Sequence, residues 1–179
     1  MRVSVFIATS LDGYIAGPDG DIDWLNNASA EVPEDDDLGY AAHMESVDIM
    51  VMGRKSYEKV LSFGDWPYGE LPMLVLSRNE ITFPEQIPNC VTHSSESPRE
   101  IVERLESQGI KHIYVDGGVT IQRFLAGGLI SDITITLIPV LLGAGIPLFA
   151  ELAKPIDLKL KASRSSENGF IQISYTMIY

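Results

Sequence analysis

Short runs of consecutive apolar residues recur along the chain, and they limit the possible folds more than any other feature. Few of these runs alternate with polar residues, which is typical of strands that are buried on both faces of a sheet. The segments between the runs carry apolar residues at helical spacing. The apolar runs cover residues 3–8, 49–52, 73–76, 113–115 and 133–138, and the helical spacing occurs at 57–61, 101–105 and 121–125. This alternation predicts an α/β fold in three layers, α/β/α, with helices on both faces of a mostly parallel central sheet.

The pattern changes after Pro155. Residues 158–162 and 170–179 alternate between apolar and polar, and residues 165–169 between them have the Ser, Asn and Gly composition of a hairpin turn. We therefore expect the sheet to end in a C-terminal antiparallel hairpin. Because the chain has 179 residues and neither a linker nor a repeat, it is expected to form one domain over residues 1–179.

Two further segments carry clear local signals. Ser97, Pro98 and Glu100 predict the start of a helix, and Gly109 predicts its end. Residues 19–37 are rich in Gly, Asp, Asn and Pro and predict a long loop between the first strand and the first helix. Loops of that length in a compact domain are often lids or binding loops.

The charge and composition of the chain disfavour several partners. Its 13 Lys and Arg stand against 25 Asp and Glu, so no large basic face is expected for nucleic acid or an anionic membrane surface. Residues 133–150 carry no charge but contain two Pro and two Gly, which favours a buried strand and a Gly-rich loop over a membrane span. The single cysteine, Cys90, favours a cytoplasmic protein without disulfides. Cys90, His43, His93 and His112 lack metal-ligand spacing, so no metal site is expected.

Three strand ends carry residues suited to an anion. Residues 115–118, Val-Asp-Gly-Gly, stand where a strand gives way to a helix, so a ligand can approach the glycine backbone and the free N–H groups of the helix start. This suits a pyrophosphate, although a tight strand-to-helix turn explains the motif equally well. Residues 51–56, Val-Met-Gly-Arg-Lys-Ser, place two cations at a helix start, where the macrodipole disfavours them unless an anion binds. Solvated surface side chains are the alternative. With Leu76, Ser77 and Arg78, these motifs predict one anion-binding crevice at the C-terminal edge of the sheet.

An acidic segment, residues 31–37, leads into a helix expected over residues 38–46. Helix capping and the helix dipole explain most of these acids. Asp37 differs because helical spacing places it on one face with Tyr40 and Met44. A buried or half-buried carboxylate is therefore expected there, with a pKa raised by burial.

Motifs along nearly the whole chain carry a family resemblance. They are residues 10–16 (Ser-Leu-Asp-Gly-Tyr-Ile-Ala), 51–58 (Val-Met-Gly-Arg-Lys-Ser-Tyr-Glu), 115–118, 129–132 (Leu-Ile-Ser-Asp) and 138–149. In this order they resemble the dihydrofolate-reductase-like superfamily. The similarity is greatest to the branch that contains the reductase domain of the bacterial bifunctional riboflavin-biosynthesis deaminase-reductase. The resemblance implies a reductase that uses NADPH, takes a small-molecule substrate and forms a homodimer.

The resemblance also implies where the cofactor binds. The 2′-phosphate of NADPH would lie near Arg54, Ser77 and Arg78, and the pyrophosphate near Gly53, Gly117 and Gly118. The complete predicted cofactor site is Ala8, Gly53, Arg54, Lys55, Ser56, Leu76, Ser77, Arg78, Asp116, Gly117, Gly118 and Val119.

Catalytic and substrate-binding residues are implied in the same way. Asp37 corresponds to the helix carboxylate that holds the pterin in dihydrofolate reductases. Asp12 would lie near the nicotinamide, with a simple turn former as the equal alternative. Trp24 would lie in the loop that covers the nicotinamide, or else anchor that loop on the core. The predicted catalytic residues are Asp37 and Asp12, and the predicted substrate-binding residues are Trp24, Tyr40, Gly143 and Gly145.

Departures from the family bear on the substrate. Folate reductases carry an Arg shortly before the third strand, whereas residues 68–72 here are Tyr-Gly-Glu-Leu-Pro, so dihydrofolate is disfavoured. No equivalent of the basic loop that holds the ribose phosphate in riboflavin-pathway reductases follows Ser56, and the deaminase motifs are missing. The sequence therefore predicts an NADPH-dependent reductase that transfers hydride to a small heterocyclic or carbonyl/imine substrate. The alternatives are a nucleotide-binding protein of the same fold without turnover, or a dihydrofolate reductase.

Overall fold

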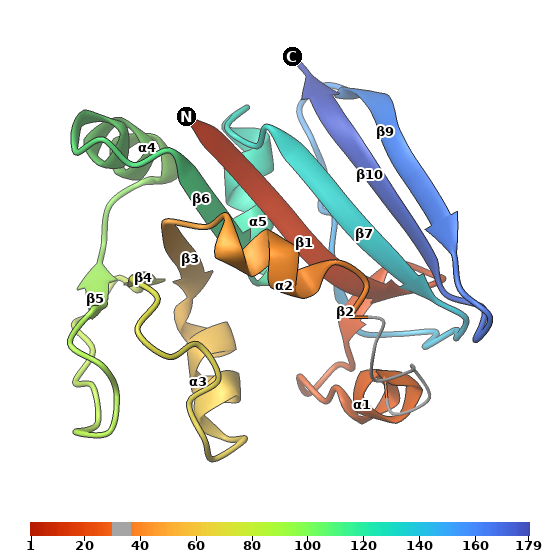
Figure 1. Ribbon diagram of the computed structural model, residues 1–179, viewed down its shortest axis with the longest axis horizontal. Coiled ribbons are helices and arrows are strands. Elements are labelled where there is room, and N and C mark those ends of the chain that lie inside the picture. Colours follow the sequence, from red (N-terminus) through yellow and green to blue (C-terminus); the bar gives the residue numbers. More distant parts are fainter. Residues whose placement is uncertain (30–36) are drawn as a thin grey trace.

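The computed structural model describes residues 1–29 and 37–179, and its centre is one sheet of eight strands in the order β5-β4-β3-β6-β1-β7-β10-β9 (Figure 1). The first six strands of this order run parallel to one another, and β10 runs antiparallel to both of its neighbours, β7 and β9. The strands of this sheet are β1 (Arg2–Ser10), β3 (Ile49–Gly53), β4 (Met73–Leu76), β5 (Val91–Ser94), β6 (His112–Asp116), β7 (Asp132–Ile138), β9 (Asp157–Ser165) and β10 (Ile171–Ile178). A small separate sheet pairs β2 (Tyr14–Ala16) with β8 (Ile146–Pro147).

Helices cover both faces of the large sheet, as the alternating pattern predicts. They are α1 (Asp23–Ser29), α2 (Tyr40–Glu45), α3 (Arg54–Leu61), α4 (Pro98–Ser107) and α5 (Gly118–Ala126). On one face, α4 and α5 bury Ile101, Ile121 and Phe124 against the sheet. On the other face, α3 buries Tyr57 and Val60 in a second core. In Figure 1, α2 crosses in front of β1 while α5 lies behind it. The predicted three-layer fold is confirmed.

Two local predictions are also confirmed. Ser97 and Glu100 form a reciprocal capping box at the start of α4, in which the Ser97 N–H donates to Glu100 Oε2 at 2.8 Å. The helix ends before Gly109, whose φ of 87° suits the end of a helix. The C-terminal hairpin joins β9 to β10, and the Ser166 N–H donates to the Phe170 carbonyl across its turn at 2.9 Å. All nine residues of β9 are exposed, because this strand forms one edge of the sheet.

The sequence prediction missed some short elements. Residues 19–37 are not a continuous loop, because α1 forms within them. It has only seven residues, too few to show a helical period. Strand β5, Val-Thr-His-Ser, has one apolar residue and forms through its pairing with β4 at the other edge of the sheet. The acidic residues 31–36 lie outside the described residues. Of the helices described, none has the length and apolar character needed to cross a membrane.

Candidate active site

The three predicted strand ends lie side by side. Strand β3 is the neighbour of both β4 and β6, and the register pairs Gly53 with Leu76 and Met52 with Asp116. Because these strands run parallel, their carboxyl ends meet at one edge of the sheet, where open α/β sheets place ligands. The predicted grouping of these motifs at one sheet edge is therefore observed.

Glycines at two of these strand ends are required by packing. A Cβ atom on Gly53 would lie 2.8 Å from Thr120 Oγ1, and a Cβ atom on Gly117 would overlap Ser56 Oγ. Gly117 also has a φ of 88°, which other residues rarely adopt. The helices that follow, α3 and α5, begin at these glycines without a side-chain cap. Their first-turn N–H groups are thus left without side-chain acceptors, as a helix N-terminus that binds an anion needs.

One of the cations at this edge, Arg54, has a local partner. Arg54 Nε donates to Glu58 Oε1 at 2.7 Å, and the two side chains are 49% and 51% exposed. The sequence predicts an anion near Arg54 at this helix start. The Glu58 carboxylate supplies part of that negative charge. Arg78 and Lys55 are exposed. Ser77 Oγ accepts the Asn79 N–H at 3.2 Å, which shapes the turn after β4.

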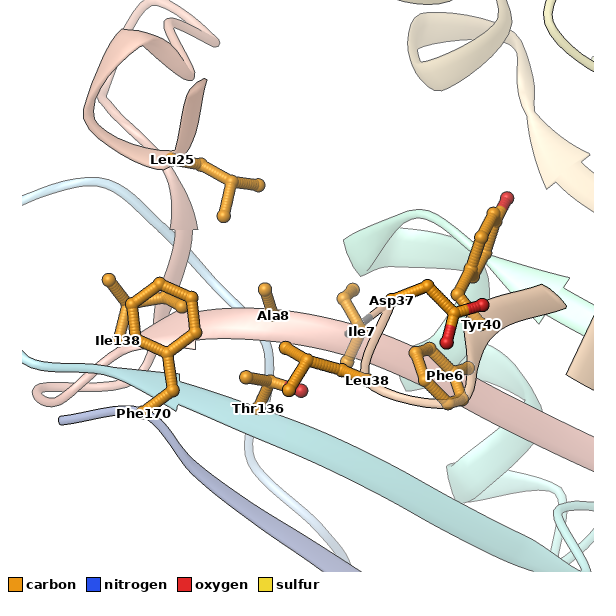
Figure 2. Close-up of a pocket in the computed structure, with 10 residues that line it drawn as sticks. All are labelled: Phe6, Ile7, Ala8, Leu25, Asp37, Leu38, Tyr40, Thr136, Ile138 and Phe170. Carbon is orange, nitrogen blue, oxygen red and sulfur yellow. The ribbon is translucent and has the colours of Figure 1, made fainter. Parts of the chain in front are cut away.

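A pocket of about 540 Å³ lies over β1 and β7, on the face of the sheet near α2. Figure 2 shows Asp37 and Tyr40 at one end, Phe170 and Ile138 at the other, and Leu25 across from Ala8. The lining residues come from β1, β7, α1, the start of α2 and the residue before β10. They are Phe6, Ile7, Ala8, Leu25, Asp37, Leu38, Tyr40, Thr136, Ile138 and Phe170. This volume suits a small organic ligand.

Asp37 lines the pocket, but its environment differs from the prediction. Leu38 and Gly39 have φ values of 56° and 79°, so the helix begins only at Tyr40 and Asp37 lies before it. The exposed Asp37 carboxylate accepts the Ala41 N–H at 2.6 Å and the Gly39 N–H at 2.8 Å. These two backbone hydrogen bonds lower the pKa of Asp37. The expected half-buried carboxyl with a raised pKa was wrong, because the helix begins two residues later than expected.

Asp116 has the properties that were expected of Asp37. It lies half-buried at the end of β6, and burial raises its pKa to about 6, against a backbone hydrogen bond from Gly117. Tyr40 and Tyr68 are close enough for the charge of Asp116 to contribute to their raised pKa values, after the burial of each ring. A carboxyl group with a pKa of about 6 therefore lies next to the strand-end Gly117, and its charge acts on the pocket residue Tyr40.

Asp12 joins two segments of backbone. Its Oδ1 accepts the Ser10 hydroxyl at 2.6 Å and the Leu142 N–H at 3.1 Å, and its Oδ2 accepts the Gly143 N–H at 2.7 Å. The Ser10 hydrogen bond is the largest cause of the lowered pKa of Asp12. These contacts favour the turn-former interpretation over a role as a proton donor.

The family of the chain follows from comparison with known proteins. Residues 2–172 match the RibD C-terminal domain. The chain belongs to the RibD C-terminal domain family. This confirms the resemblance to the reductase branch of the dihydrofolate-reductase-like superfamily.

Several relatives of this RibD-family chain span its full length. A putative riboflavin biosynthesis protein from Shewanella sp. PV-4 is 40% identical, with a TM-score of 0.92 and 100% of both chains covered. Uncharacterized protein YwjB of Bacillus subtilis (strain 168) is 35% identical over 176 residues, 97% of each chain. A diaminohydroxyphosphoribosylaminopyrimidine deaminase/5-amino-6-(5-phosphoribosylamino)uracil reductase from Thermotoga maritima matches with a TM-score of 0.71. It is 16% identical, and the match covers 99% of this chain and 56% of that one, so it supports the fold alone.

Some predicted site residues of this RibD-family chain lie elsewhere. Trp24 is in α1 but does not line the pocket, whereas its neighbour Leu25 does. Gly143 and Gly145 hold the loop before β8 in place, since a Cβ atom on Gly145 would overlap the Ala16 carbonyl. Ala8, predicted for the cofactor, lines the pocket.

Two predicted cofactor residues in the first turn of α5 differ in exposure. A Cβ atom on buried Gly118 would lie 2.9 Å from Ile15 Cδ1, so this glycine packs on β2. Val119 is 66% exposed. Within residues 1–29 and 37–179, no three His, Cys, Asp or Glu side chains form a group that could hold a metal ion.

Sequence reasoning missed much of the pocket wall. Phe6, Thr136 and Ile138 belong to predicted strands, but nothing in their spacing shows that they face a cavity. Phe170 follows the hairpin turn and reaches the pocket because β10 pairs with β7. The sequence signal that could have predicted the β1 part of this wall was the alternation of side chains between the two faces of a strand. In β1, residues 4, 6 and 8 share the face that carries the pocket, and the opposite face packs on α5.

Proposed function

We propose that this RibD-family chain is an NADPH-dependent reductase that reduces a small ring or carbonyl/imine compound held in the pocket. The observation that best supports this is the pair of glycine turns, β3–α3 and β6–α5. They present two uncapped helix starts on neighbouring strands. Thr120 and Ser56 leave no room for a side chain at Gly53 and Gly117, so both turns keep a bare glycine backbone.

The residues present fit NADPH, which when bound supplies the hydride. The first-turn N–H groups of α3 and α5 would hold its pyrophosphate. Arg54 and Arg78 would receive the 2′-phosphate, and Arg54 would then share its charge between that phosphate and Glu58. The apolar pocket walls would exclude water from the substrate. Asp116 does not line the pocket, so it would pass a proton from its carboxyl group to the reduced substrate through an intervening water.

Titration of NADPH and NADH tests the cofactor. NADPH should bind at least about tenfold more tightly, because NADH lacks the 2′-phosphate and one charge-assisted contact is worth about 1.5–3 kcal/mol. Replacing both Arg54 and Arg78 with Ala should remove this preference. Arg123→Ala, at an exposed Arg in the last turn of α5, is the matched control. Equal dissociation constants in the wild-type protein would contradict the proposal.

Steady-state oxidation of NADPH tests turnover, with pteridines, pyrimidines and quinoid or nitro compounds as acceptors. Dihydrofolate should be a poor substrate, because residues 68–72 offer no cation to its glutamate and the net charge of −12 repels it. Tight NADPH binding without oxidation by any acceptor would instead favour the nucleotide-binding protein without turnover.

We also propose that the protein forms a homodimer through the edge strand β9. Leu158 and Leu160 of this strand are 47% and 55% exposed, and its outer backbone groups have no neighbouring strand in the described sheet. Sedimentation of the wild-type protein should give the mass of two chains, and Leu160→Glu should shift it towards one.

A further inference from the structure

The lining of the pocket restricts the chemistry of what it can hold. Three of its ten residues are aromatic, Phe6, Tyr40 and Phe170, and most of the others are aliphatic. The polar groups are the Asp37 carboxylate and the hydroxyls of Tyr40 and Thr136. Thr136 Oγ1 already accepts the Gln172 amide at 3.1 Å. This lining offers flat apolar contact with a few hydrogen-bonding groups, as binding sites for ring compounds do.

No cation lines the pocket among the residues that the structure describes. The charged group that does line it is Asp37, whose carboxylate stays ionised because backbone hydrogen bonds lower its pKa. Residues 30–36, which precede Asp37 in sequence, contain no Lys, Arg or His. The positive charge of Arg164 in β9 also lowers the pKa of Asp37. Arg164 lies outside the lining, and its Nε donates to Gln172 Oε1 at 3.1 Å.

A phosphate group is poorly suited to such a pocket. It carries close to two negative charges near neutral pH, and proteins bind it with Arg, Lys or converging backbone N–H groups. The N–H groups of Gly39 and Ala41 at the pocket end already donate to Asp37. A phosphate there would face a carboxylate at close range, and the described lining of the pocket offers no cation to compensate. The strand-end glycines offer N–H groups, but in the proposed function they hold the cofactor.

We infer that the pocket takes a flat, phosphate-free ring compound, neutral or positively charged, rather than a phosphoribosyl compound. The Thermotoga maritima relative is named for a substrate that carries a phosphoribosyl group. The chain would then share the fold of that protein but act on a substrate of another class. The part of this inference that concerns the substrate rests on the proposed function. The part that concerns which ligands the pocket binds can be tested by binding measurements, without turnover.

The experiment uses two matched pairs of ligands and calorimetry on the full chain. One pair is 5-amino-6-(5-phosphoribosylamino)uracil and its dephosphorylated riboside, and the other is flavin mononucleotide and riboflavin. Each titration is repeated with saturating NADP⁺. A phosphorylated compound that binds at the strand-end turns will lose affinity when NADP⁺ is present, whereas one that binds in the pocket will not. In at least one pair, the phosphate-free member should bind the pocket at least tenfold more tightly than its phosphorylated partner.

A designed cation gives the matched control. Leu25 faces the pocket from α1, opposite Ala8 (Figure 2). Leu25→Arg should strengthen binding of the phosphorylated member about tenfold or more, because it supplies the missing charge-assisted contact. Leu25→Gln removes the same apolar side chain without adding charge and should not strengthen it. NADPH affinity should stay within about twofold in both variants, since Leu25 is not at the strand-end turns.

The inference is overturned if, with NADP⁺ present, no phosphate-free member binds more tightly than its phosphorylated partner. It is also overturned if phosphorylated binding in the wild-type protein is strong and falls in Arg164→Gln, since that cation would then serve the pocket. Failure of the proposed function has a different signature. NADPH would not bind, while the preference for phosphate-free ligands, measured without NADP⁺, would persist.

Discussion

The Asp12 carboxylate accepts the Gly143 N–H at 2.7 Å and so ties the turn after β1 to the loop before β8. Its Oδ1 holds the neighbouring Leu142 N–H at 3.1 Å. In Asp12→Ala both amides lose their acceptor, so hydrogen exchange at Leu142 and Gly143 should become roughly tenfold faster or more. Asp12→Asn keeps one acceptor oxygen and should show a smaller change. If Asp12→Ala instead abolished turnover while leaving exchange unchanged, Asp12 would act on the substrate.

Gly117 is predicted to be essential to the cofactor turn. Gly117→Ala adds a Cβ atom that would overlap Ser56 Oγ at a residue with a φ of 88°. The turn must shift, so NADPH affinity should fall by at least about tenfold, measured by fluorescence titration. Gly109→Ala is the matched control, because Gly109 has a φ of 87° but nothing within 4 Å of its would-be Cβ. That variant should lose stability through backbone strain alone and keep its NADPH affinity. Similar affinity losses in both variants would mean that general instability, not the turn, is responsible.

Much of the fold was predictable because strands that are buried on both faces of a sheet consist of consecutive apolar residues. The residues 73–76 were predicted as a strand and are β4, and the capping box of Ser97 and Glu100 predicted the start of α4. Both signals are local, and both belong to elements that the core holds in place. Short elements such as β5 and α1 gave no comparable signal, because they form through pairing and packing with distant segments.

The candidate site was predictable only in part, for a similar reason. Motifs with Gly, Ser and Arg after strands predicted that these strand ends lie together, since parallel strands bring their carboxyl ends to one edge of the sheet. The pocket depends on which side chains of β1, β7 and the residue before β10 lie opposite one another. Alternation within one strand predicts which residues share a face, but it does not predict which residues of other segments lie opposite them. The error at Asp37 arose from Leu38, whose φ of 56° interrupts the helical spacing on which the prediction relied.

Asp116, rather than Asp37, should determine how activity depends on pH. The pKa of Asp116 is raised to about 6 by burial, so its carboxyl is protonated below that pH and loses its proton above it. If it donates a proton to the substrate, turnover should fall as the pH rises through about 6. Asp116→Asn should remove that limb of the pH–rate profile. Asp37→Asn should leave the limb in place, because the pKa of Asp37 is lowered. A limb that persists in Asp116→Asn would assign it to another group.

The same pKa shift makes Asp116 a source of instability. Its folded pKa lies above the unfolded value of 3.8, so the fold favours the protonated form. The stability this provides is complete below about pH 3.8 and is lost as the pH rises through about 6. Asp116→Asn should therefore be more stable than the wild-type protein at pH 8, by at most about 3 kcal/mol, and the gain should vanish near pH 4. Urea unfolding at the two pH values measures it.

His43 is predicted to destabilise the fold in acid. It is 9% exposed, and its Nε2 is buried without a hydrogen-bond partner among the described residues. Burial is the largest cause of the lowering of its pKa to about 4, and the neighbouring His112 and Arg2 lower it further, against Asp132. The fold therefore favours neutral His43. The stability this gives is complete above the unfolded pKa of 6.5 and is lost as the pH falls towards 4, by roughly 3 kcal/mol.

His43→Phe tests this without emptying the site. The His43 ring stacks on Phe6 with centroids 4.9 Å apart and planes 28° from parallel, a contact that a phenyl ring can keep. The variant does not titrate, so its free energy of unfolding should decrease less than that of the wild-type protein between pH 7 and pH 4.5. Part of the decrease should persist, because the buried His112 also has a lowered pKa. At pH 8 both proteins have a neutral ring at this position, so a difference there measures packing alone and is subtracted. Parallel curves after that subtraction would show that His43 does not cause the acid sensitivity, and would direct attention to His112 and its hydrogen bonds to Ser4 and Ser46.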